Sequence, residues 1–264
     1  MAEQSYLLDN AWQRGRARLD AVEAFLDPGT IALLDRIGVR PGWHCLELGA
    51  GGGSIASWLA ERAGAAGRVV ATDLDTRHLV AAVSAPTIEV LRHDIVNEPL
   101  AEGAFDLIHA RLVLEHLPER DRVLPKLVRG LRPGGWLLIE SVDYISAVPV
   151  SALGAREHEH SQDVRLRQFD GAGIKFDLGR RLPRMLRDNG LADIGNEGRV
   201  FVMEGGSPGA LWFQLSMEQL RPRLVGPGKL SDAEVDRMLA LFADPDWAAL
   251  SPVIFAAWGR RPAR

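Results

Sequence analysis

A glycine-rich turn is the part of the sequence best suited to chemistry. Gly49, Gly51, Gly52 and Gly53 occupy four of the five positions that follow the apolar run at residues 43–48. Glycines at such a turn let the backbone reverse tightly and approach a ligand closely, and the first turn of a following helix presents free N–H groups. A simple reversal does not need four glycines. The pattern therefore predicts that this turn binds a nucleotide-type ligand.

Carboxylates near the turn distinguish two kinds of nucleotide ligand. Asp73 lies 20 residues after Gly53, at the end of the next apolar run, where a nicotinamide dinucleotide site has its ribose-binding acid. Ser54, however, stands where the third glycine of G-x-G-x-x-G, counted from Gly49, is expected. Glu47 would also repel a pyrophosphate and favour a cation. The sequence thus favours a positively charged ligand, with an NAD(P)-dependent oxidoreductase as the alternative.

Short apolar runs separated by helical spacing predict the scaffold that positions these residues. Strands are expected at residues 43–48, 68–72, 87–92, 105–110 and 136–140. Helical spacing lies between them, most clearly over residues 117–131, with residues 132–135 as its terminator. Strands that alternate with helices form βαβ units and a parallel sheet. We therefore expect a doubly wound α/β protein that binds its ligand at the carboxyl edge of the strands.

Three further stretches are expected to shape the pocket. Residues 1–40 are predicted to form an amphipathic helical cover, and residues 41–264 the core domain. Two insertions in this core, at about 143–178 and 208–246, are expected to act as lids, the first irregular and charged, the second helical. The remaining expected elements are a helix at 182–189, an extended run near 194–203 and a final strand at 252–259.

The order of these motifs resembles the class I S-adenosylmethionine-dependent methyltransferases. The resemblance rests on LELGAGGGS, VVATDLD, RHDIVNEPL and FDLIHARLVLEHLP followed by LRPGGWLLIE, in register between about residues 40 and 143. The lead-in YLLDNAWQRGRARL is similar to the cofactor-covering helix of bacterial small-molecule enzymes of the ubiquinone/menaquinone and natural-product types. The resemblance implies a Rossmann-like, mostly parallel seven-stranded sheet and an enzyme that converts S-adenosylmethionine (SAM) to S-adenosylhomocysteine (SAH).

The resemblance also implies which residues hold the cofactor. Its methionine end would lie against Arg16, Glu47, Gly49, Ala50, Gly51, Ala110 and Arg111. Within this set Glu47 is expected near the ammonium group and Arg16 near the carboxylate. Its nucleoside end would lie against Asp73, Leu74, Asp94 and Ile95. Carboxylates suit ribose hydroxyls and the adenine amine, and apolar side chains suit the base, although the two aspartates could instead cap helices.

A charged stretch in the first insertion offers candidate catalytic groups. Glu157 and His160 are three residues apart, so on a helix they can share a face and act as a base toward an acceptor hydroxyl or amine. His158 and His160 are two apart, which argues against a shared metal, and no metal site is expected. Asp143 and Tyr144 are rival pocket residues. A solvent-exposed helix is the alternative interpretation of this stretch.

Two histidines and an apolar cluster are expected to have structural roles. His109 lies within the predicted fourth strand and His116 follows it, so packing or capping is expected of them. Residues 211–224 are rich in large apolar side chains. This composition predicts core packing, and it also predicts an apolar wall beside the methyl acceptor.

Composition limits the partners and the setting. The 264 residues include 31 Lys and Arg against 35 Asp and Glu, a formal net charge of −4, which argues against nucleic-acid binding. The sequence has no run of ~18 apolar residues to span a membrane, and the single Cys45 favours a reducing, cytoplasmic location. We therefore predict an enzyme, monomeric or homodimeric, that methylates O, N or C of a small, partly apolar molecule. A SAM-binding relative without methyl transfer, such as a cyclase or decarboxylase, is a further alternative.

Overall fold

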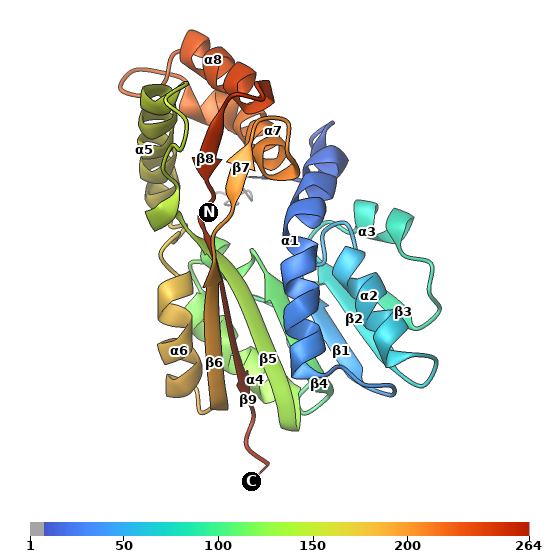
Figure 1. Cartoon of the computed structure of the whole chain (residues 1–264). Coiled ribbons are helices and arrows are strands. Elements are labelled where there is room, and N and C mark those ends of the chain that lie inside the picture. Colours follow the sequence, from blue (N-terminus) through green and yellow to red (C-terminus); the bar gives the residue numbers. More distant parts are fainter. Residues whose placement is uncertain (1–7, 264) are drawn as a thin grey trace.

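A seven-stranded sheet lies at the centre of the computed structural model, which describes residues 8–263 (Figure 1). Its strand order is β3-β2-β1-β4-β5-β9-β6. The strands are β1 (His44–Leu48), β2 (Arg68–Asp73), β3 (Ile88–Arg92), β4 (Phe105–Arg111), β5 (Leu131–Asp143), β6 (Ala192–Arg199) and β9 (Val253–Arg260). The first five are parallel, and β9 runs antiparallel between β5 and β6. The predicted doubly wound, mostly parallel seven-stranded fold is confirmed.

The strand order reverses beside β1, and this reversal opens a crevice. The chain passes from β1 outward to β2 and β3, then crosses back to β4 on the other side of β1. The loops that leave the carboxyl ends of β1 and β4 therefore run in opposite directions. In open α/β sheets, ligands bind at such a switch point.

Helices cover both faces of the sheet. One face packs against α4 (Arg120–Gly130) and α6 (Leu182–Asp188), whose buried leucines join those of β4 and β5. The other face packs against α2 (Ser54–Ala63), α3 (Arg77–Ala82) and the second half of α1 (Gly15–Ile37). The strands β1, β4 and β5 are mostly buried, as expected for strands covered on both sides, whereas the edge strand β3 is partly exposed.

An outer layer stands beyond the carboxyl edge of the sheet (Figure 1). It consists of α5 (Ala155–Gly171), α7 (Pro208–Leu224), α8 (Asp232–Ala243) and the small sheet of β7 (Val202–Glu204) and β8 (Ala248–Leu250). Its own core contains Phe213, Phe242 and Trp247, and the ring centroids of the last two are 5.0 Å apart. The helical character expected for residues 208–246 is therefore found in two helices.

The long helix α1 links the outer layer to the sheet. It packs on α7 at one end and on α2 at the other, so it crosses the crevice from one layer to the next (Figure 1). The predicted helical cover extended over residues 1–40, of which residues 1–7 lie outside the described part. No helix within residues 8–263 has the length and apolar character needed to cross a bilayer.

Three boundaries differ from those expected. Residues 155–171, expected to be irregular, form the helix α5. The sequence did not predict this helix because its buried face includes the polar residues His158, Ser161 and Arg165 and so lacks an apolar stripe. The helix expected at 117–131 begins at Arg120, since residues 114–116 form a separate 3-10 turn. Residues 132–135, expected to terminate that helix, belong to β5, with a register shift opposite them in β4.

Candidate functional site

A cavity of about 750 Å³ lies between the carboxyl ends of β1, β2 and β4 and the outer layer. It is lined by α1 on one side and by α5 and α7 on the other. The glycine turn and the acidic residues at the ends of β2 and β3 form the end of the cavity next to the sheet. The cavity therefore coincides with the switch point of the sheet, and it connects a polar end to an apolar end.

The glycine turn adopts a conformation that other residues would strain. Gly49 and Gly51 have φ angles of +70° and +56°, in the left-handed region. A Cβ added to Gly49 would lie 2.3 Å from the Val113 side chain, so the turn also needs glycine for close packing. The Gly51 N–H donates to the Asp73 carboxylate at 3.0 Å. The turn and the acid at the end of β2 therefore hold each other in place.

Nine of the eleven residues expected to hold the cofactor line this cavity. They are Glu47, Gly49, Ala50, Gly51, Asp73, Leu74, Asp94, Ile95 and Arg111. Asp94 also accepts hydrogen bonds from the backbone N–H of Val96 (2.9 Å) and the side-chain amide of Asn97 (2.7 Å), so it closes the turn after β3 as well. The structure thus brings together residues from four strand ends that are far apart in the sequence.

Two expected cofactor residues do not reach the cavity. Arg16 lies beside the glycine turn, where it donates to the Gly52 carbonyl at 3.1 Å and pairs with Asp20 and Glu23. Arg18, on the same helix, lines the cavity instead. Ala110 is fully buried within β4, and the chain reaches the cavity only after it. The helix phase of α1 and the length of β4 thus keep these two residues out of the cavity lining.

The residues at the polar end fit the SAM expected from the sequence. Asp73 is largely buried, which raises the pKa of its carboxyl, and both of its oxygens accept backbone N–H bonds, from Gly51 and Asp75. Such a fixed carboxylate can accept hydroxyl hydrogens. Ile95 and the half-exposed Leu74 offer apolar surface for the adenine ring. Within the described residues, no group of three or more metal-ligating side chains occurs.

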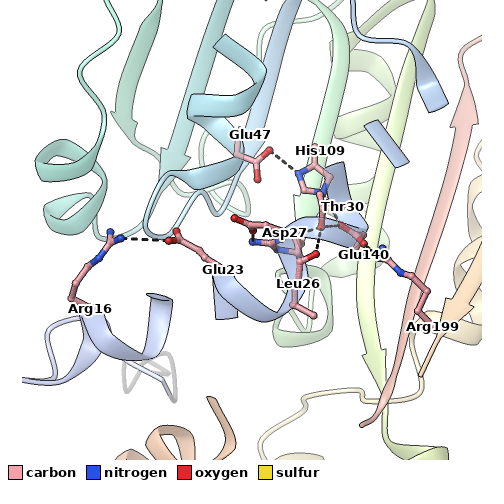
Figure 2. A network of polar contacts seen from close by, with 10 residues as sticks. Arg16, Glu23, Leu26, Asp27, Thr30, Glu47, His109, Glu140 and Arg199 are labelled. Atoms are coloured by element: carbon pink, nitrogen blue, oxygen red, sulfur yellow. Dashed lines mark hydrogen bonds and ion pairs between the residues drawn. The ribbon is translucent and has the colours of Figure 1, made fainter. Parts of the chain in front are cut away.

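A network of buried charges lies directly behind the glycine turn (Figure 2). His109 of β4 lies between two carboxylates, with its Nδ1 2.7 Å from Glu47 of β1 and its Nε2 3.3 Å from Glu140 of β5. Glu140 also pairs with Arg199 of β6 and accepts from the Thr30 hydroxyl of α1 at 2.5 Å. One imidazole therefore connects three adjacent strands, and its partners connect a fourth strand and α1.

The charges in this network set the protonation of its members. Burial alone would lower the pKa of His109, but Glu47 and Glu140 outweigh it and raise the pKa to about 9. Burial alone would raise the pKa of Glu140, and the hydrogen bond and charge of His109 hold it below the ordinary value. His109 is therefore a cation at neutral pH. Its charge compensates that of Glu47, so the carboxylate expected to attract the ligand is already paired.

A second arginine extends the network to the cavity. Arg111 pairs with Asp27 of α1 at 2.8 Å and donates to the Thr30 hydroxyl at 2.9 Å. The covering helix comes close to the sheet at this point, because a Cβ on Gly29 would lie 1.7 Å from the Arg199 guanidinium. The position of α1 over the cavity thus depends on buried polar contacts.

The expected catalytic pair is not brought to this cavity. Glu157 and His160 line a separate, smaller cavity of about 220 Å³ between α5 and α8. His160 is half-exposed there, with its Nε2 3.7 Å from the Glu234 carboxylate of α8. The two side chains do share one region of α5, as their spacing predicts. The helix directs Arg165 and Phe169 into the main cavity instead, so Glu157 and His160 do not lie at the site where a base is expected.

Several residues of the main cavity were not assigned a function from the sequence. Glu115 is fully buried, and burial raises its pKa to about 7. Burial and the nearby Arg18 and Arg120 lower the pKa of His116 to about 4, so its imidazole is neutral. Arg165 lines the far side. The motif LEHLP offered a sequence signal that could have identified Glu115 and His116 as cavity residues. Nothing in the sequence pattern of α5 distinguished Arg165 from its neighbours.

Five aromatic side chains form the apolar end of the cavity, which we call the aromatic wall: Tyr144, Phe169, Phe176, Trp212 and Phe213. Ring centroids in this wall lie 4.8 Å apart for Tyr144 and Phe176 and 5.2 Å apart for Trp212 and Phe213. Tyr144, a rival pocket residue in the sequence, is thus part of the cavity. Burial raises the pKa of its phenol, which stays protonated at neutral pH.

Comparisons with known proteins match the same region. Residues 46–139 match the family model described as a methyltransferase domain. The chain is 32% identical over 142 residues to methyltransferase str3 of Strobilurus tenacellus, covering 53% of this chain and 48% of that protein. It is 30% identical over 111 residues to the ubiquinone/menaquinone biosynthesis C-methyltransferase UbiE of Laribacter hongkongensis, covering 40% of this chain and 46% of that protein. The chain thus spans about half the length of these curated relatives.

A solved structure is similar in fold over almost the whole chain. It is the Haemonchus contortus phosphoethanolamine N-methyltransferase 2 in complex with S-adenosyl-L-methionine, with a TM-score of 0.61 and 17% sequence identity. The match covers 99% of this chain and 60% of that one. At this identity the likeness concerns the fold, including the outer layer beyond the sheet.

Replacing the acid at the end of β2 tests the polar end of the cavity. Asp73→Asn removes the negative charge while keeping the size of the side chain. We expect SAH affinity, measured by calorimetry, to fall roughly 10- to 100-fold, the scale of losing charge-assisted hydrogen bonds. Glu89→Gln, an exposed carboxylate on β3, is the matched control and should leave affinity unchanged. Normal SAH affinity in a folded Asp73→Asn protein would remove Asp73 from the binding site.

Replacing the central imidazole tests the buried network. His109→Gln leaves the buried Glu47 carboxylate without the cation it pairs with and leaves Glu140 with Arg199 as its ion-pair partner, so we expect the free energy of unfolding to fall by about 3–5 kcal/mol. The folded-state pKa of His109 is raised from 6.5 to about 9, so its charge stabilises the fold fully below pH 6.5 and progressively less as the pH passes 9.

The difference in the free energy of unfolding between wild type and His109→Gln, measured by denaturant titration, should therefore shrink between pH 6.5 and pH 10. His160→Gln, at an exposed site, is the control and should show a small difference at every pH. A large and pH-independent loss for His109→Gln would mean that His109 contributes packing and not charge.

Proposed function

We propose that this chain, whose residues 46–139 match the family model described as a methyltransferase domain, is a SAM-dependent methyltransferase, as the sequence motifs predicted. Its acceptor is a small, partly apolar molecule. The observation that carries this proposal is the single cavity, which joins the glycine turn and Asp73 at one end to the aromatic wall at the other. Two reactants can therefore meet in the same cavity.

The polar end is proposed to hold SAM. Asp73 would accept the ribose hydroxyls, and Ile95 and Leu74 would contact the adenine. Gly49 and Gly51 leave room for the methionine moiety beside the backbone. Arg18, which lines the cavity from α1, is the arginine placed to approach its carboxylate, in place of Arg16. SAM supplies a methyl group on a sulfonium, which is an activated leaving group.

The remaining residues act by position. Methyl transfer is an in-line displacement, so holding the acceptor atom in line with the methyl group and the sulfur supplies much of the rate. The aromatic wall would hold an apolar acceptor, and α1 and α7 contribute side chains to the lining of the cavity beside it. Residues 1–40 and the segments at 143–178 and 208–246 are proposed to be the cover and the lids of this cavity.

We assign proton removal from the acceptor to His116. It follows β4, lines the cavity, and its ring meets Phe176 of the aromatic wall edge-on at 6.3 Å between centroids. Because its pKa is lowered to about 4, the imidazole is unprotonated at neutral pH, which is the form that accepts a proton. A pKa this far below neutral also makes it a weak base, so its contribution to the rate belongs at the low end of the range for general-base catalysis. The Glu115 carboxyl beside it, with a pKa of about 7, is a second group that changes charge near neutral pH.

The proposed partners follow from the cavity and the charge. The acceptor is a small molecule, and neither a nucleic acid nor a membrane is a proposed partner. A monomer or homodimer in the cytoplasm is the proposed state, and O, N and C remain possible methyl-accepting atoms. Cys45, the single cysteine, is buried in β1, and burial raises the pKa of its thiol to about 12, so it stays an unreactive thiol.

Ligand binding and label transfer together test the proposed function. Calorimetry with SAM, SAH, NAD and NADP should give tight binding of SAM and SAH alone. Incubation with methyl-deuterated SAM and a panel of phenols, amines and activated carbon acids, followed by mass spectrometry, should then reveal a labelled product. Binding of NAD or NADP in place of SAM would favour the oxidoreductase. Binding of SAM with no label transferred to any acceptor, including a cell extract, would favour the non-methylating alternative.

A paired substitution tests where the base lies. His116→Asn should lower kcat at least about tenfold on any acceptor that becomes labelled, with SAH affinity nearly unchanged, because proton transfer typically contributes 10²- to 10⁴-fold. His160→Gln, which changes a histidine in the smaller cavity, should leave kcat within about twofold. The opposite result, with loss at His160 and none at His116, would return the base to α5.

A further inference from the structure

Arg165 is a buried cation in the apolar half of the cavity. It lies on the inner face of α5 and is 4% exposed, and it lines the cavity beside the aromatic wall. Its guanidinium carbon lies 5.1 Å from the ring centroid of Phe213 and 5.9 Å from that of Tyr144. A charged group has therefore been placed among rings that would suit an apolar ligand by themselves.

This arginine differs from two partly buried arginines near the site, which have carboxylate partners. Arg111 pairs with Asp27 and Arg199 pairs with Glu140. Arg165 forms no ion pair within residues 8–263, and its Nε and Nη2 are buried without a hydrogen-bond partner in that range. Burial lowers its pKa, but an arginine keeps its proton at neutral pH.

An unpaired buried charge is costly, and the two rings compensate for it only in part. Cation–π contacts are weaker than the desolvation penalty of an isolated ion. Replacing such a charge by an apolar side chain of similar size often stabilises a protein. A cation kept in this position without a protein partner is therefore matched to an anion that arrives with a ligand.

We propose that Arg165 binds a carboxylate of the methyl acceptor, so that the acceptor is an apolar, acidic small molecule. This inference rests on the proposed function and specifies its substrate class. Nε and Nη2 form the side of the guanidinium that binds a carboxylate through two parallel hydrogen bonds. A carboxylate carries one negative charge, which one guanidinium neutralises. A dianionic phosphate would leave a second charge unpaired among the rings.

The position of Arg165 also orients the acceptor. α5 lies across the cavity from the glycine turn, so a carboxylate held on α5 directs the opposite end of the molecule toward the polar end. The acceptor body then lies along the aromatic wall, against Phe213 and Tyr144. Arg165 is therefore a residue that determines specificity and orientation, and it has no role in the proton transfer assigned to His116.

Matched probes test this inference on the full-length protein saturated with SAH. Calorimetry compares 4-phenylbutyrate with its neutral amide and with 3-phenylpropyl phosphate. Wild type should bind the carboxylate at least about tenfold more tightly than the amide, and more tightly than the phosphate. Arg165→Met should bind the carboxylate and the amide equally, with SAH affinity unchanged. Arg167→Met, which removes an exposed arginine of the same helix paired with Asp163, should keep the preference.

Several results would overturn the inference. One is that the wild-type protein does not prefer the carboxylate to the amide, or binds neither. Another is that the Arg165→Met protein still prefers the carboxylate. A preference for the phosphate overturns the assignment of a carboxylate. Weaker SAH binding in Arg165→Met would mean that the arginine serves the cofactor. Since SAH binding is measured first, its absence in wild type would reject the proposed function, whereas normal SAH binding without a carboxylate preference rejects this inference alone.

Melting temperature gives a second readout that separates ligand binding from a structural role. Without ligand, Arg165→Met should melt at the same temperature as wild type or higher, because an unpaired buried charge has been removed. A melting temperature several degrees lower would show that Arg165 stabilises the fold through its ring contacts, and this result would also count against the proposal.

Discussion

The contact of His109 with two buried carboxylates is the constraint on which the site depends. It joins β1, β4 and β5 side by side, and Glu47 lies only two residues before the glycine turn. The Thr30 hydroxyl of α1 donates to the same Glu140 (Figure 2). The network that supports the floor of the cavity therefore also positions the helix that lies over it. A shift of the central imidazole would therefore move both sides of the cavity.

The cavity beyond this network combines two environments. Its polar end is built from backbone N–H groups and fixed carboxylates, whereas its apolar end is built from rings contributed by α5, α7 and the loops beside them. An unpaired guanidinium, that of Arg165, interrupts the apolar end. The charges of the network have partners within residues 8–263, and the guanidinium on α5 has no ion-pair partner in that range. This contrast separates residues that hold the fold from residues that await a ligand.

The sequence predicted the parts whose physical signal is local. The glycine turn, the alternation of strands and helices and the acids at strand ends identified the sheet and nine residues that line the cavity. The sequence did not predict which side chains line the cavity where this depends on how helices and strands pack against one another. Arg16 and Arg18 are two residues apart, and only the packing of α1 decides which one lines the cavity. Likewise α5 buries polar side chains, so its pattern resembled a solvent-exposed stretch, and the pattern did not show that Glu157 and His160 line the smaller cavity.

The central claim is that one cavity holds the cofactor at the glycine turn and leaves the aromatic wall free for the acceptor. A crystal structure of the protein grown with SAH tests it most directly. The account predicts density running from Gly49 and Gly51 to the carboxylate of Asp73, with the adenine beside Ile95 and the space beside Arg165 unfilled by SAH. SAH bound against the aromatic wall, or outside the cavity altogether, would contradict the account.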